Sequence, residues 1–169
     1  MNADELRLLQ APLKEQYRAE PESAVVTLQA NGSLGEGVTC SVQTGRALVE
    51  AGLHPAVGGS GAAACSGNML LEALVACAGV TLSAVATALS IELRDAYLVA
   101  EGDLDFRGTL GVSKEAPVGF KNIRLQFTLD TDASQEQLDT LIRLTERYCV
   151  VYQTLAHTPA LSVTRKHAS

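Results

Sequence analysis

GNMLLEALVACAGVTLSAVATALS, residues 67–90, is the stretch that decides the fold of this chain. From Ala73 to Ile91 it contains no charged residue. Its apolar residues surround a helix instead of forming one stripe, which is typical of a helix covered on most sides. Asn68 or Ser66 can cap its start. We therefore predict a long central helix over residues 68–90.

The same run approaches the roughly 20 apolar residues that a membrane-spanning helix needs. Alanine is its commonest residue, and it also contains the hydroxyl residues Thr81, Ser83, Thr87 and Ser90. Neither an aromatic belt nor a Lys/Arg cluster flanks it. We therefore expect a helix buried in protein and no membrane partner. Small residues at one-turn spacing would let another backbone approach this helix closely.

Hydrophobic periodicity and turn residues predict the remaining elements. In chain order they are a helical extension over 1–20, strands over 24–30 and 38–42 joined by an Asn31-Gly32 turn, a long Gly/Ala/Pro connection over 45–67, strands over 94–107 and 122–129, a helix over 134–149 and a last strand over 161–164. Ser134 and Gln137 have capping-box spacing at the start of the second helix. The expected fold class is α+β, because the predicted strands form mainly antiparallel pairs and the helices lie on one face. We expect residues 21–169 to form a single domain.

Size and charge exclude some classes of function. A chain of 169 residues fits one domain. Its composition, with 47% hydrophobic and 19% charged residues, is typical of a folded protein. The net charge of −6 argues against a nucleic-acid partner, which would need a basic face. Residues 1–18 are charged throughout and lack the apolar core of a secretory signal, so we expect a cytoplasmic protein with reduced thiols.

Cysteines are the candidate reactive groups. Cys77 and Cys149 both fall on apolar helical stripes, where a cysteine either packs as a small hydrophobe or reacts, and spacing alone does not show that the two meet. Cys65 precedes the long helix, and His54 lies in the Gly-rich connection as a possible base or cation. The chain has no Cys-x-x-Cys and only scattered histidines, so a zinc site is not expected. No P-loop is present, because Gly58-Gly59-Ser60-Gly61 is not followed by Lys-Ser/Thr.

Three segments together resemble the OsmC/Ohr superfamily: GNMLLEALVACAGVTLSAVA, PVGFKNIRLQFTLDTDAS and ERYCVVYQTL. Its members show a long helix that carries a cysteine, a strand ending in Asp-x-Asp and a helix ending in a second cysteine. The resemblance runs from about Ala24 to the C-terminus. It implies an OsmC-like fold with antiparallel sheets and a long central helix. It also implies an intertwined homodimer whose active sites lie at the subunit interface, with no cofactor.

The resemblance assigns roles to three residues. Cys77 matches the family's peroxidatic cysteine, and Cys149 matches its resolving cysteine. The resemblance therefore implies a thiol-dependent peroxidase that reduces organic hydroperoxides in the oxidative stress response. A dithiol reductant would recycle the enzyme. Because the thiolate is the nucleophile and burial raises a thiol pKa, a cation is expected near Cys77. Arg46 in QTGRALVE is the best match for the family's arginine.

The chain also departs from the family pattern. The family's glutamate near the helix start falls here on Gly67 or Asn68, with Glu50 as a possible substitute for it. Glu72 lies five residues before Cys77 and is expected to point elsewhere. Many members have proline after the second cysteine, where this chain has Val150.

Two alternatives to the peroxidase stay open. The first is an OsmC-like binding or redox-sensing module with little turnover, which the missing glutamate favours. The second is a hotdog-type thioesterase, which also has a long helix against a sheet but has no use for Cys149. Acyl-CoA hydrolysis that is unaffected by Cys149→Ser would favour the thioesterase.

Overall fold

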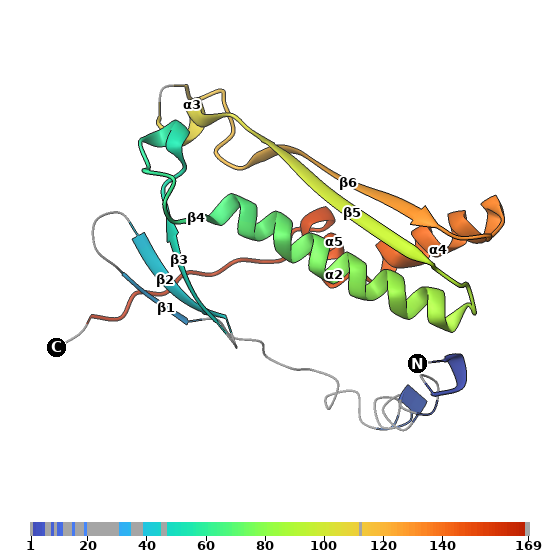
Figure 1. Ribbon diagram of the computed structural model, residues 1–169. Coiled ribbons are helices and arrows are strands. Elements are labelled where there is room, and N and C mark those ends of the chain that lie inside the picture. Colours follow the sequence, from blue (N-terminus) through green and yellow to red (C-terminus); the bar gives the residue numbers. More distant parts are fainter. Residues whose placement is uncertain are drawn as a thin grey trace.

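The computed structural model of the chain describes residues 2–5, 8, 10, 11, 15, 19, 31–34, 39–44, 47–111 and 113–167 (Figure 1). Among residues 1–20, positions 3–5, 8, 10, 11, 15 and 19 are helical. The domain division at residue 20 stays a prediction. Two small sheets and several helices give the α+β class that the sequence predicts.

The first sheet contains β1 (Asn31–Leu34), β2 (Thr39–Thr44), β3 (Ala47–Gly52) and β4 (Ala64–Cys65), hydrogen-bonded in that order. β1, β2 and β3 are antiparallel neighbours, whereas β3 and β4 run parallel. The predicted Asn31-Gly32 turn is wrong, because both residues pair with β2. The predicted strand over 24–30 lies outside the described residues.

The predicted long connection over 45–67 is also wrong. It contains β3, the short 3₁₀ helix η2 (Pro55–Val57) and β4. β3 pairs with β2 over its whole length, from Thr44↔Ala47 to Thr39↔Gly52. A neighbouring strand thus supplies the hydrogen bonds that favour an extended backbone, although the sequence of this region is rich in glycine and alanine.

Helix α2 (Ser66–Ala88) follows β4 directly, and its 23 residues confirm the predicted long helix. Its buried residues are spaced four apart and form a single stripe: Leu74, Ala78, Leu82 and Ala86. Much of the rest of α2 faces outward, and Val80 is 73% exposed. By length and composition α2 could cross a membrane, and 28% of its most apolar window is buried within the chain. The single chain therefore does not cover α2 on most sides.

Strands β5 (Asp95–Leu104) and β6 (Phe120–Asp130) form a long antiparallel hairpin that runs alongside α2 (Figure 1). The predicted alternation is confirmed, since Ile123, Leu125, Phe127 and Leu129 are partly buried and pack on the core. The short helix α3 (Phe106–Thr109) follows β5. In β5, Gly102 leaves room for the Phe120 ring, because a Cβ there would lie 2.4 Å from a ring carbon.

Helix α4 (Gln135–Tyr148) packs on α2 through Leu141. The Leu141 side chain is fully buried and belongs to the same core cluster as Leu82 and Ile91. The predicted capping box is present: Ser134 and Gln137 each accept the other's backbone N–H. A further helix, α5 (Val150–Ala156), begins directly after Cys149.

The predicted last strand over 161–164 is wrong. These residues join no sheet in the part of the chain that the structure describes, and Leu161 and Val163 are 84% and 97% exposed. Their alternating pattern favours a strand, but no strand among the described residues pairs with them.

Candidate active site

Cys77 and Cys149 lie together where α2 meets the junction of α4 and α5. Cys77 is partly buried on α2, one position before Ala78 of the buried stripe, and Cys149 is 1% exposed. Both belong to the same apolar cluster. The Cys149 thiol hydrogen-bonds to the Cys77 sulfur. The fold thus joins two sulfur atoms that are far apart in the sequence.

Cys149 occupies a break between two helices. It caps the end of α4 and the start of α5, with an extended backbone at φ −73° and ψ 108°. Its own N–H still bonds to the Thr145 carbonyl at 2.9 Å, and its sulfur accepts the Tyr152 N–H at 3.5 Å. The break places the first N–H groups of α5, those of Val150 and Val151, where they lower the pKa of the Cys77 thiol.

Hydrogen bonds activate Cys77. Burial by itself raises the pKa of this thiol, but four donors outweigh it and hold the pKa below its ordinary value. In decreasing order of effect, the donors are the Val151 N–H, the Cys149 thiol, the Val150 N–H and the Thr81 hydroxyl. In the structure the Thr81 hydroxyl donates to the Cys77 carbonyl oxygen at 2.8 Å, one helical turn earlier, so its contribution to the Cys77 sulfur is the smallest of the four.

Cys149 shows the opposite behaviour. Burial raises the pKa of its thiol, and the hydrogen bond to Cys77 and the negative charge on Cys77 raise it further. The N–H groups of Tyr152 and Val151 oppose these effects. The pair therefore contains one thiol whose pKa lies below its ordinary value and one whose pKa lies above it.

The site can now be compared with known proteins. The sequence pattern of the family described as OsmC-like protein matches residues 59–164, a segment that contains both cysteines and more than half of the chain. The chain belongs to the OsmC-like family. No curated protein sequence matches it.

Solved structures show the same OsmC-like fold. An OsmC-like protein from Mycoplasma pneumoniae superposes with a TM-score of 0.67 at 16% identity, over 79% of this chain and 89% of that one. An organic hydroperoxide resistance protein OsmC from Legionella pneumophila gives 0.62 at 20% identity, over 79% and 92%. One from Elizabethkingia anophelis, an organic hydroperoxide resistance protein, gives 0.64 at 15% identity, over 80% and 91%.

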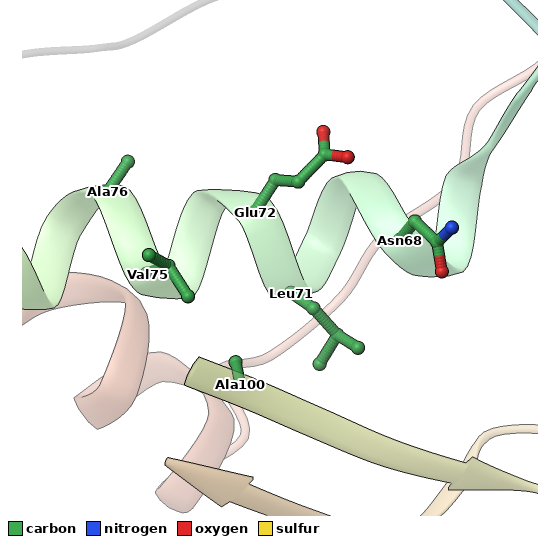
Figure 2. Close-up of a pocket in the computed structure, with 6 residues that line it drawn as sticks. All are labelled: Asn68, Leu71, Glu72, Val75, Ala76 and Ala100. Atoms are coloured by element: carbon green, nitrogen blue, oxygen red, sulfur yellow. The ribbon is translucent and has the colours of Figure 1, made fainter. Parts of the chain in front are cut away.

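A groove lies at the start of α2 in this OsmC-like chain. The groove has a volume of about 400 Å³ and is lined by Asn68, Leu71, Glu72, Val75, Ala76 and Ala100. Figure 2 shows Leu71 and Val75 on the side of α2 that faces Ala100 of β5, whereas Glu72 points away from β5. Glu72 is exposed, in accord with the prediction that it points elsewhere.

Among the described residues, the other predicted candidates do not join the cysteine pair. Arg46 lies outside the described residues, between the end of β2 and the start of β3. Glu50 is exposed on β3. His54 caps η2 by accepting the Ala56 N–H at its Nδ1 (3.1 Å), and its ring stacks on Phe106 of α3 at 4.9 Å.

Cys65 caps the start of α2, twelve residues before Cys77, which corresponds to about 18 Å along the helix axis. It is therefore too far away for a bond to Cys77 in the same chain. His157 and His167 are exposed near the C-terminus. In the part of the chain that the structure describes, no group of three or more His, Cys, Asp or Glu is placed to hold a metal ion.

The sequence reasoning missed the donors around Cys77. Thr81 could have been found, because residues four apart on a helix are neighbours and a hydroxyl can bond back one turn. The N–H groups of Val150 and Val151 carry no signal in the sequence, since their direction depends on the break at Cys149.

Proposed function

We propose that this protein is a thiol-dependent peroxidase that reduces organic hydroperoxides through Cys77 and Cys149. The observation that carries the proposal is the direct contact of the two sulfurs, with the pKa of Cys77 lowered and that of Cys149 raised. A nucleophilic thiolate beside a protonated thiol is the arrangement that two-step thiol chemistry requires. The hydroperoxide resistance proteins of the same fold give the proposal its substrate class.

In the proposed reaction the Cys77 thiolate attacks the distal oxygen of the hydroperoxide. The O–O bond breaks, the alkoxide takes a proton and leaves as an alcohol, and Cys77 becomes a sulfenic acid. Cys149 then attacks the Cys77 sulfur, which forms a disulfide and releases water. In sum, one hydroperoxide and two thiols give one alcohol, one water and one disulfide, and an external dithiol restores the thiols.

An apolar hollow beside the pair suits the organic part of such a substrate. Its volume is about 540 Å³, and its lining includes Thr81, Val80, Val85 and Leu144. Thr81 links the hollow to the proposed nucleophile, because its side chain lines the hollow and its hydroxyl donates to the Cys77 carbonyl oxygen at 2.8 Å. We also propose that Arg46 is the activating cation and that the protein acts in the cytoplasm.

The proposal predicts a specific disulfide. One equivalent of cumene hydroperoxide is expected to convert the reduced protein to a form two mass units lighter, with Cys77 joined to Cys149 in the peptide map. Mass spectrometry of the intact chain and of its non-reducing digest measures this. Intact thiols after the treatment would contradict the proposal.

A dithiol recycler separates the peroxidase from a redox-sensing module with little turnover. With dihydrolipoamide present, a peroxidase consumes many equivalents of hydroperoxide per chain. A redox-sensing module with little turnover stops after it has consumed about one equivalent of hydroperoxide per chain. The sensor stays the second candidate because Gly67 and Asn68 occupy the positions where the family has its glutamate.

We further propose that the protein is an intertwined homodimer whose α2 helices are covered by the partner. Val80 is 73% exposed and Leu70 39% exposed on the uncovered side of α2, next to the exposed Ala73 and Ala76. Continuous apolar surface of this kind marks an interface more often than free surface. A second copy is the natural occupant, since most soluble oligomers are symmetric homo-oligomers.

Val80→Arg is expected to turn the dimer into a monomer, because it places a charge in the proposed interface without disturbing the interior of the single chain. Size-exclusion chromatography with light scattering checks this: the wild type should have twice the chain mass of 17.8 kDa, and the variant a single one. Gln126→Arg, on the outer face of β6, is the matched control and should stay dimeric. A monomeric wild type would contradict the proposal.

A further inference from the structure

The side chain of Gln153 bridges the break between α4 and α5. Its Nε2 donates a hydrogen bond to the Glu146 carbonyl oxygen at 2.8 Å, seven residues earlier in the chain. Its backbone N–H donates to the Cys149 carbonyl at 2.9 Å, inside α5. One residue is therefore fixed in the second helix by its backbone and holds the end of the first helix by its side chain.

The carbonyl that Gln153 satisfies is one that the break leaves without its usual partner. In a continuous helix the Glu146 carbonyl accepts the N–H of the residue four positions later, which is Val150. Here the extended backbone at Cys149 interrupts that bond, and the Val150 N–H is instead one of the groups that hold the pKa of Cys77 below its ordinary value. The Gln153 amide thus replaces Val150 at the Glu146 carbonyl, and the Val150 N–H becomes available to the thiolate.

We propose that Gln153 is a positioning residue of the active site: by occupying the Glu146 carbonyl, its side chain keeps the break at Cys149 and directs the Val150 and Val151 N–H groups at Cys77. The inference deepens the proposed peroxidase function and rests on it for its biological meaning. Without the Gln153 amide, the Glu146 carbonyl competes with the Cys77 sulfur for the Val150 N–H. Cys77 then loses part of its stabilisation as a thiolate.

The surroundings of Cys77 make its ionisation a direct readout of this effect. Cys149 and Tyr152 are the other titratable residues of the described apolar cluster that contains Cys77, and β5 and β6 contribute apolar side chains to it: Leu98, Ala100, Ile123, Leu125 and Phe127. Arg46 belongs to the residues outside the described ranges, and it is the same in every variant compared below.

Gln153→Met is the main test, because methionine has a similar length and no donor. Peptide-resolved alkylation of Cys77 by iodoacetamide, followed against pH in the full chain, reports its thiolate fraction without any peroxide. The midpoint is expected to rise by about one pH unit, which is about tenfold less thiolate on the acid side. Gln153→Lys restores a donor and should return the midpoint toward the wild type, measured at high salt to screen the added charge. Gln126→Met on β6 is the control and should not move it.

A double-mutant cycle tests the route through Val150. Val150→Pro removes the N–H itself, and proline suits the first position of a helix after an extended residue such as Cys149. Val150→Pro alone should raise the midpoint, and adding Gln153→Met should raise it little further, because both act on the same donor.

Two results would overturn the inference: a folded Gln153→Met protein whose alkylation profile matches the wild type, or full additivity in the cycle. Lower thermal stability with an unchanged profile would show a structural role only and would equally refute it. Circular dichroism verifies that each variant is folded. Because the assay needs no hydroperoxide, its failure and the failure of the peroxidase proposal are distinguishable.

Discussion

Cys77→Ser is expected to lower the rate of hydroperoxide reduction by on the order of 10³-fold or more, because a serine hydroxyl does not ionise near neutral pH and removes the nucleophile. Coupled turnover with a dithiol and cumene hydroperoxide measures this loss. Cys149→Ser is expected to differ in kind: Cys77 still consumes about one equivalent of hydroperoxide, and the product is a sulfenic acid that dimedone traps.

Cys65→Ser is the matched control for both variants. Cys65 lies at the start of α2, about 18 Å along the helix from Cys77, so its loss should leave turnover within about twofold of the wild type. Equal activity of the Cys77→Ser and wild-type proteins would show that the reaction uses another group. Loss of activity in Cys65→Ser alone would show the same.

Leu141→Ala is expected to lower the free energy of unfolding by about 3 kcal/mol, within the 2–5 kcal/mol typical of such truncations. Leu141 is fully buried, and it joins α4 to Leu82 of α2 and to Ile91. Removal of its side chain leaves a cavity at the contact that sets the position of α4 on α2. Urea unfolding of the reduced protein, followed by circular dichroism, measures the change.

Leu161→Ala is the control for this loss of stability. Leu161 is 84% exposed, so the same truncation should change the free energy of unfolding by less than about 0.5 kcal/mol. A change of less than about 1 kcal/mol for Leu141→Ala would mean that the two helices are held together by other contacts.

Where the sequence predicted structure well, the signal was local. The uncharged run of α2, the alternation of β6 and the capping box at Ser134 all act within a few residues, and all three are confirmed. β3 and β4 were missed because their residues are extended by pairing with strands that lie elsewhere in the chain. Helix α5 was missed because Val150 and Val151 have a low helix propensity.

The same contrast holds for the site. Cys77 and Cys149 were found through the resemblance to a family, and the structure places them in contact. Burial taken alone raises the pKa of Cys77, which is why a nearby cation was expected, although the net pKa of this thiol is lowered. The sequence does not reveal the neutral groups that lower the pKa of Cys77, above all the Val151 N–H, because their direction depends on a helix break that no residue type specifies.

Cys77 is partly exposed and Cys149 is buried, and this difference decides which sulfur of a Cys77–Cys149 disulfide an external dithiol can reach. If oxidation joins them, an incoming dithiol can reach only the partly exposed Cys77 sulfur, since Cys149 is 1% exposed. Cys149 is then the leaving group, and a thiol with a raised pKa leaves slowly. We therefore expect reduction of such a disulfide to begin with attack of the dithiol on Cys77.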